Sequence, residues 1–157
     1  MTVDALSKYL ESLCLEVELL RKHEKIKLLK RWKDRYIAPF EKLYDSAEKS
    51  WDLHVFENNL LPCVTDTEAE KEFSLTSPEP CYILPSDGGP GLLCSSKPPA
   101  DLSRFCLEGA RPWPFAPAGN GRTLAESYFL ISPASMNWTF VIHAEGSYFA
   151  MSPELSR

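Results

Sequence analysis

The chain has 157 residues, a usual size for one domain, and 44% of them are hydrophobic, which is enough to form a buried core. No run approaches the roughly 18 apolar residues that span a bilayer, and residues 1–10 lack the pattern of a secretory signal, so we expect a cytoplasmic protein with no membrane partner. The five cysteines include no C-x-x-C pair, which argues against a disulfide framework and against a cysteine zinc site. We expect reduced, mostly buried thiols and no cofactor.

Charge is distributed unevenly around a formal net charge of −5. Residues 1–50 contain 11 Lys and Arg against 9 Asp and Glu, whereas residues 51–157 contain 6 against 13. Within residues 21–35, eight cations face only Glu24 and Asp34. This is the one local charge cluster strong enough to need an explanation.

The cationic cluster is a candidate site for anions or nucleic acid. Lys22, Lys30 and Arg31 would bind phosphates, while Trp32 or Tyr36 would stack on a base. The acidity of the whole chain argues against a nucleic-acid partner, because it repels polyanions at longer range. The alternative is an ordinary solvated face of a helix.

Two helical runs occupy the first 50 residues. Apolar residues recur at steps of three and four between residues 4 and 20, which predicts one helix there. The same spacing continues through residues 25–50, but Pro39 removes an N–H group and crowds the preceding turn. We therefore expect a kink, or two helices that meet, at residues 37–39.

The middle of the chain is less regular. An acidic helix is predicted over residues 66–73, capped by Thr65 or Asp66, with Ala69 and Phe73 facing inward. A short strand is predicted over residues 81–84. The next segment, residues 85–121, holds 13 Gly and Pro in 37 residues and is predicted to be mostly loop, with a strand at residues 92–94 and a helical turn at residues 100–105.

The strongest β pattern lies near the C-terminus. Residues 127–132 and 138–143 are rich in aromatic and β-branched side chains, which predicts an antiparallel hairpin. Gly146 is expected to end this ribbon before a last strand at residues 148–151. With helices first and strands later, we predict a single α+β domain over residues 1–157, in which N-terminal helices pack on one face of a small antiparallel sheet. Its helical part would be residues 1–50 and its sheet-containing part residues 51–157.

Several short motifs resemble a family of small bacterial proteins catalogued only as a domain of unknown function. The motifs are Trp51-x-x-His54-x-Phe56, Pro62-Cys63, Asn137-Trp138-Thr139-x-Val141, His143-x-Glu145 and Tyr148-Phe149. The resemblance covers about residues 50–150 and implies a closing aromatic hairpin. The chain departs from the family pattern, in which His and Glu are adjacent and Gly-Pro-Tyr-Phe follows. No activity is attached to the family, so the resemblance bears on the fold.

His143 and Glu145 form the first candidate catalytic pair. Residues two apart in a strand point to the same face, so their imidazole and carboxylate could act as acid and base or as two metal ligands, with His54 as a further imidazole. A thiol–imidazole pair of Cys63 or Cys81 with His143 is a second possibility. The alternatives are a structural hydrogen bond at the end of the strand and buried structural thiols. No set of three metal ligands is identifiable, so we predict no metal.

Trp113 lies between two prolines and beside Phe115, which makes it a candidate for an exposed recognition element. The alternative is that Trp113 fills a gap over the sheet. Our leading hypothesis is a non-enzymatic protein-interaction module, of the immunity or antitoxin kind, whose acidic surface suits a basic protein partner. The second hypothesis is a small hydrolase or metal-dependent enzyme that uses His143 and Glu145. The third is nucleic-acid binding through residues 21–35.

Overall fold

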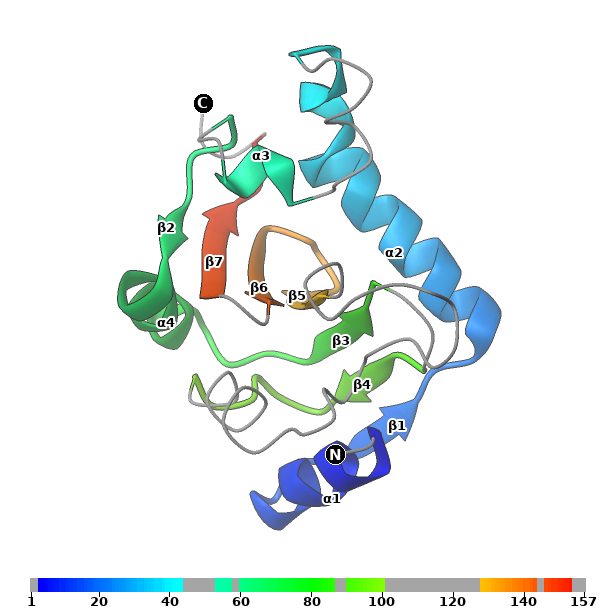
Figure 1. Cartoon of the computed structure of the whole chain (residues 1–157). Helices are drawn as coiled ribbons and strands as arrows, with labels where there is room; N and C mark the ends of the chain where they lie inside the picture. Colours follow the sequence, from blue (N-terminus) through cyan, green and yellow to red (C-terminus); the bar gives the residue numbers. More distant parts are fainter. Residues whose placement is uncertain are drawn as a thin grey trace.

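A computed structural model of the chain describes residues 3–43, 53–57, 60–86, 90–100, 128–143 and 146–153. These residues form an α+β fold around one antiparallel sheet of seven strands, in the order β1-β4-β3-β5-β6-β7-β2 (Figure 1). The strands are β1 (Val17–Leu19), β2 (Val64–Thr65), β3 (Cys81–Pro85), β4 (Leu92–Cys94), β5 (Tyr128–Pro133), β6 (Trp138–His143) and β7 (Gly146–Met151). The helices are α1 (Val3–Ser12), α2 (Lys22–Tyr36), the 3-10 helix η1 (Ala38–Leu43), α3 (His54–Glu57) and α4 (Asp66–Leu75).

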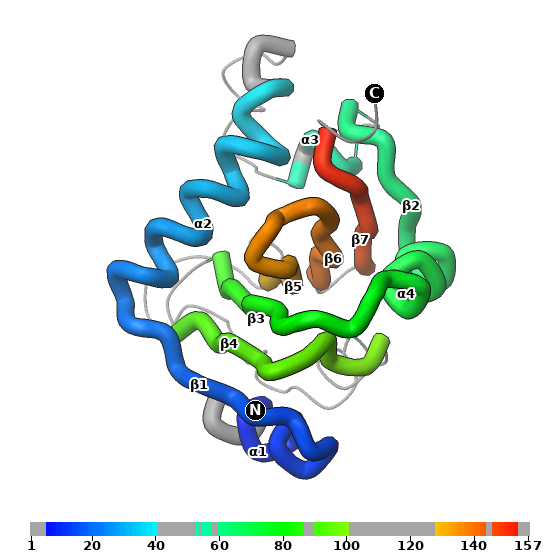
Figure 2. Tube along the Cα trace, turned by 180° about the vertical axis from the view of Figure 1, so that it is seen from behind, coloured from blue at the N-terminus to red at the C-terminus, as the bar shows by residue number. Residues whose placement is uncertain are grey.

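Helices cover both faces of the sheet, and this corrects the prediction that they share one face. Every residue of β5 and β6 is buried, so each face of these central strands needs a cover. On the first face, α1 and α4 pack on alternate strand residues such as Phe129 and Ile131. On the second face, α2 and α3 pack on the intervening residues such as Tyr128 and Leu130. We call these the α1/α4 face and the α2/α3 face. Figure 1 and Figure 2 both show α2 and α4 on opposite sides of the strands.

The first helix is shorter than its apolar spacing predicts. It ends at Ser12, and Cys14 follows with a φ of 66°, the left-handed backbone that commonly closes a helix. The N–H groups of Leu13 and Leu15 both donate to the carbonyl of Leu10 there. The following residues then form β1, whose Val17 lies opposite Cys94 of β4. The predicted helix over residues 13–20 is therefore wrong, because pairing with a distant strand outweighs the local period.

The break near Pro39 is confirmed. The α-helix ends at Tyr36, and Pro39 lies in the first turn of η1. An N–H group in a first turn has no acceptor within its helix, so proline costs no hydrogen bond at this position. Residues 44–50 lie outside the described part of the chain. The Tyr36 hydroxyl donates a 2.7 Å hydrogen bond to the carbonyl of Met136, and this bond ties the end of α2 to the β5–β6 turn.

The predicted acidic helix, the middle strands and the C-terminal hairpin are confirmed. Ala69 and Phe73 of α4 are fully buried, and Thr65 precedes the helix in extended backbone without a side-chain capping bond. Gly146 does not end the ribbon but begins β7. A Cβ atom at this glycine would lie 2.8 Å from the Oδ1 atom of Asp66, so a larger residue here would displace the carboxylate that accepts a hydrogen bond from the Ser147 N–H.

Candidate functional site

A groove with acidic side chains at its rim lies beside the C-terminal end of α4. It encloses about 400 Å3, and we call it the acid-rimmed groove. Its lining residues are Glu72, Leu75, Thr76, Ser77, Glu79, Asn137, Trp138, Phe149 and Met151. They come from α4, the segment that follows it, and the ends of β6 and β7, so four parts of the chain meet at this position.

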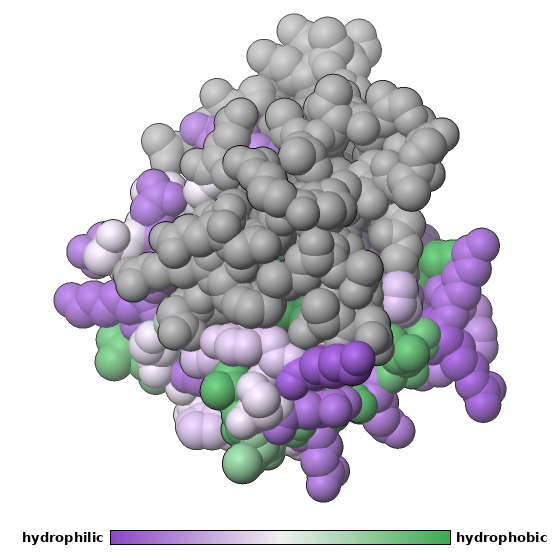
Figure 3. Space-filling model, turned by 60° about the horizontal axis from the view of Figure 1, so that its bottom comes forward, coloured by the Kyte–Doolittle hydropathy of each residue, from purple (hydrophilic) through white to green (hydrophobic). Residues whose placement is uncertain are grey.

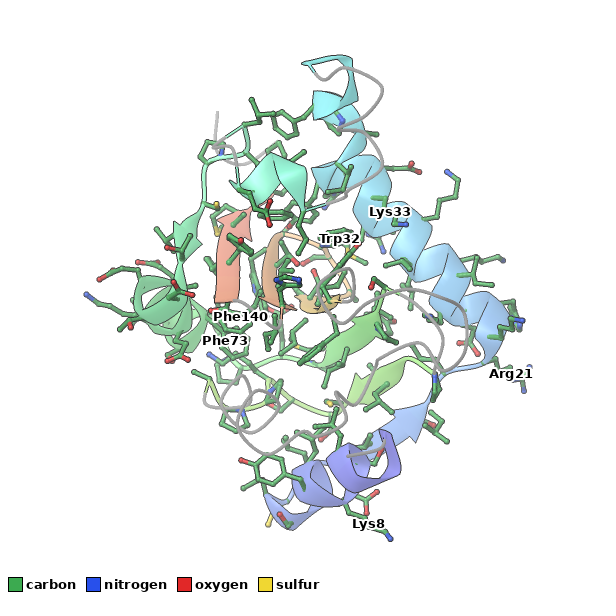
Figure 4. All side chains as sticks on the ribbon, viewed as in Figure 1. Lys8, Arg21, Trp32, Lys33, Phe73 and Phe140 are labelled. Carbon is green, nitrogen blue, oxygen red and sulfur yellow. The ribbon has the colours of Figure 1, made fainter. Side chains whose placement is uncertain are left out.

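An aromatic cluster forms the rigid side of the groove. Trp138 and Phe149 lie on the neighbouring strands β6 and β7, with stacked rings whose centroids are 5.9 Å apart. Phe73 of α4 meets the Trp138 ring edge-on at 5.5 Å. Its ring centroid also lies 4.5 Å from that of Phe140, and Figure 4 shows these two side chains beside each other. Such pairs add about 0.5–1.5 kcal/mol beyond the burial of their area. Trp138 and Phe149 are each only 5% exposed, so their positions are fixed by the core behind them.

Two exposed apolar side chains stand at the edges of this aromatic surface. Leu75, the last residue of α4, is 72% exposed, and Met151, the last residue of β7, is 43% exposed. Scattered exposed leucines are common on proteins, but these two border a concave aromatic surface. Covering them with a partner would remove apolar area from water that the chain alone leaves exposed.

Lys97 fixes the end of α4 from which Leu75 projects. Its ammonium group donates to the carbonyl oxygens of Phe73, Ser74 and Thr76 at 3.0, 3.0 and 2.7 Å, and it lies 5.3 Å from the centre of the Phe73 ring. The Phe73 carbonyl also accepts from the N–H and hydroxyl of Thr76, and the cation adds a donor for the carbonyls at this helix end and complements the negative end of the helix dipole. Burial lowers the pKa of this ammonium group. Leu75 is therefore held on an ordered helix end.

The rim of the groove is acidic. Glu72 and Glu79 line it, and α4 as a whole carries four carboxylates against the single cation Lys71. Carboxylates around an apolar depression favour a partner that presents cations beside an apolar side chain. The groove thus combines a hydrophobic contact surface with a charge that selects the partner.

The structure tests one half of the predicted His143 and Glu145 pair. His143 ends β6 and is only 2% exposed, opposite Tyr128 of β5 and Gly146 of β7. It shares the α2/α3 face with Thr139 and Val141. Glu145 lies outside the described residues. His54, the further candidate imidazole, begins α3, and its side chain lies outside what the structure describes.

The predicted thiol–imidazole pair with Cys81 is wrong. Cys81 lies on the α1/α4 face of the sheet, whereas His143 lies on the opposite face. Burial raises the pKa of the Cys81 thiol to about 12, which keeps it protonated at neutral pH. Cys63 donates a 3.6 Å hydrogen bond from its thiol to the carbonyl of Phe56, and burial raises its pKa as well. Neither thiol has the lowered pKa of a cysteine nucleophile.

The cationic cluster lies on the outer surface of α2. Lys22, Lys30 and Arg31 are all exposed, as the sequence predicts. Trp32 and Tyr36 are fully buried on the α2/α3 face, so the predicted stacking of these rings on a base is wrong. Trp113 and Phe115 lie outside the described residues. Among the residues that the structure describes, no three or more His, Cys, Asp or Glu side chains gather into a possible metal site, and no helix is long and apolar enough to cross a membrane.

Sequence reasoning missed the acid-rimmed groove. The groove depends on the register that sets Trp138 opposite Met151, and on the end of α4 lying across the same strands. The one local signal was Leu75, an apolar residue beyond the inward positions Ala69 and Phe73 of the acidic helix. Comparison of the chain with protein families, with curated proteins and with solved structures gave no match.

Proposed function

We propose that this chain is a protein-interaction module that binds a basic segment of a partner protein in the acid-rimmed groove. The observation that carries the proposal is the exposure of Leu75 and Met151 beside the aromatic pair Trp138 and Phe149. An apolar anchor of the partner would enter the depression and contact all four side chains. Interfaces gain most of their affinity from a few such buried anchors.

The expected energy of the contact follows from the exposed apolar surface. Full burial of a leucine or methionine side chain contributes about 1.5–3 kcal/mol. Leu75 and Met151 still expose large parts of their surface, so covering both should supply a few kcal/mol before the cost of association is subtracted. The aromatic side of the groove is already ordered by Phe73, so little conformational entropy would be lost there on binding.

The charge of the rim determines which partner fits. Glu72 and Glu79 would attract Lys or Arg side chains that flank the anchor, and the net charge of the chain, −5, would steer a basic protein toward it. Exposed charges of this kind mainly raise the rate of association, and they lose effect as salt is added. An immunity or antitoxin factor that neutralises a basic protein would act through such a surface.

A photo-crosslinking experiment tests the proposal. A benzophenone amino acid is placed at Leu75 and, as a control, at Leu19, which is 67% exposed on the opposite edge strand of the sheet. The cells are those of the native host, and the products of neighbouring genes are tested individually. We expect one adduct from position 75 and none of the same mass from position 19.

A pair of charge-matched variants shows whether the groove itself is used. Reversing Glu72 and Glu79 to lysine should abolish the adduct, whereas reversing the exposed Glu11 and Glu18, which changes the net charge equally, should leave it intact. The proposal fails if both crosslinker positions give the same adducts, or if both double reversals reduce the adduct equally.

A further inference from the structure

The second charged surface of the molecule is the outer side of α2. This helix carries seven cations and two carboxylates over 15 residues. Its inner side is fixed to the sheet, because Trp32 Nε1 donates a 2.9 Å hydrogen bond to Thr139 Oγ1 and Tyr36 is tied to Met136. The outer side therefore faces solvent along the helix, and Figure 4 shows Trp32 directed toward the strands and Arg21 directed away from them.

Some of the α2 cations are already engaged. Lys30 forms a 2.7 Å ion pair with Asp34, Arg35 donates to the carbonyl of Ser135, and Lys25 is buried. Lys22, Lys27 and Arg31 are exposed, and no carboxylate among the described residues pairs with them. Figure 3 shows hydrophilic side chains projecting at the right-hand edge of the molecule, where Figure 1 places α2.

The acidic residues of α4 do not neutralise this surface. α4 lies on the opposite face of the sheet from α2, and each helix alone is about 10–12 Å across with its side chains. Their outer sides are therefore separated by more than the Debye length of about 8 Å at physiological salt. The net negative charge of the chain thus coexists with a strongly positive side.

Lys22, Lys27 and Arg31, the exposed α2 cations that pair with no carboxylate among the described residues, lie on two flanks of the helix. Arg31 comes nine positions after Lys22, which places the two about 180° apart around the helix, and Lys27 lies about 40° from Arg31. A flat membrane surface can contact only one flank of a helix, and the apolar side that would enter lipid is buried against the sheet. The major groove of B-form DNA is about 12 Å wide, admits one α-helix and has phosphates along both walls.

We infer that the outer side of α2 binds duplex DNA through its phosphates, with Lys22 on one wall of the major groove and Lys27 and Arg31 on the other. No aromatic ring of α2 is free to contact a base, since Trp32 and Tyr36 are both in the core. The binding is therefore independent of sequence and has the weak affinity of non-specific contacts, with a Kd of about 10⁻⁴ to 10⁻⁶ M. This inference is independent of the acid-rimmed groove.

Fluorescence anisotropy of a labelled duplex of about two helical turns, with the full chain as titrant, tests the inference. Three phosphate contacts predict a slope of about −2.7 for log K against log salt, which is about a 40-fold loss of affinity between 50 and 200 mM salt. A second duplex of unrelated sequence should bind equally. Lys27→Glu combined with Arg31→Glu should reduce the slope to about −0.9 and the loss to about 3.5-fold.

The matched control is Lys8→Glu combined with Lys71→Glu. These substitutions reverse two exposed cations on α1 and α4 and change the net charge by the same amount. It should retain the slope of the unchanged protein, and circular dichroism should show that both variants are folded. The inference is overturned if no binding occurs at about 0.1 mM protein and 50 mM salt, where non-specific binding is measurable, or if both double variants lose binding equally. Binding to vesicles of phosphatidylserine and phosphatidylcholine in equal parts, but not to the duplex, would overturn it in favour of lipid.

Discussion

The hydrogen bond between Trp32 and Thr139 should be a main determinant of how firmly α2 is held on the sheet. It is buried, its length is 2.9 Å, and it joins the C-terminal half of α2 to the second residue of β6. Thr139→Val keeps the shape of the side chain but removes the hydroxyl acceptor, which leaves the indole N–H buried without a partner. An unsatisfied buried donor costs about 1–3 kcal/mol. We therefore expect the free energy of unfolding to fall by about 2 kcal/mol, and Tm by about 4–8 °C for a chain of this size.

The reverse variant has a larger expected effect. Trp32→Phe leaves the Thr139 hydroxyl without its donor and also opens a void among the Phe56 and Tyr128 rings, whose centroids lie 6.2 and 5.9 Å from that of Trp32. Its cost should be about 2–5 kcal/mol. In the double variant both polar partners are gone, so the loss should be smaller than the sum of the single losses by about 1–2 kcal/mol.

The assay is urea unfolding followed by circular dichroism, because Trp32→Phe alters the tryptophan fluorescence that would otherwise serve as the probe. The slope of the free energy of unfolding against urea concentration should be the same in all variants if the substitutions affect only the native state. As a control pair, Trp32→Phe is combined with Ser74→Ala on α4, on the opposite face, and these losses should add within about 0.5 kcal/mol. Strict additivity of Trp32→Phe and Thr139→Val would refute the reasoning.

Three further predictions follow from the other packed contacts. Lys97→Met should lower the free energy of unfolding by about 1–3 kcal/mol, because the carbonyls of Ser74 and Thr76 lose the ammonium donor, while that of Phe73 keeps the N–H and hydroxyl of Thr76; urea unfolding measures this. Burial raises the pKa of the Cys81 and Cys94 thiols from 9.0 to about 12 in the folded protein. Below pH 9 the thiols are protonated in the folded and in the unfolded protein, whereas between pH 9 and pH 12 they ionise only in the unfolded protein. The free energy of unfolding should then fall by about 1.4 kcal/mol per pH unit for each thiol up to about pH 12, and Cys94→Ala should reduce the slope; equal slopes would contradict this origin. Gly146→Ala should cost about 1–3 kcal/mol because its Cβ displaces the Asp66 carboxylate from its hydrogen bond with the Ser147 N–H, and an unchanged Tm would show that this side chain rotates aside freely.

Elements that depend on local residue types were predictable from the sequence. The run of aromatic and β-branched residues in β5 and β6 allows little besides a strand, and the inward spacing of Ala69 and Phe73 determines α4. The end of α1 was not predictable, because Val17 continues the helical period of the residues before it. Its pairing with Cys94 of β4 is a contact between distant residues, which the period does not reveal.

The two candidate sites, the outer side of α2 and the acid-rimmed groove, also differ in how far the sequence predicts them. Exposure of the α2 cations follows from the helical period, since Trp32 and Tyr36 determine which side faces the core. The acid-rimmed groove depends instead on where the end of α4 meets Trp138 and Met151, and no local pattern records that meeting. The arrangement of helices on both faces could have been inferred from the continuous apolar runs of β5 and β6, which leave neither side suited to water.

The place of β6 in the sheet has a consequence for biosynthesis. Trp32 and its partner Thr139 are 107 residues apart, so a ribosome that adds about 5–20 residues per second completes α2 roughly 5–20 s before β6. During most of that interval the nascent helix lacks β5 and β6, the strands whose Tyr128 and Thr139 contact its indole ring. Slower translation downstream of α2 should therefore increase the share of newly made chains that aggregate or are held by chaperones.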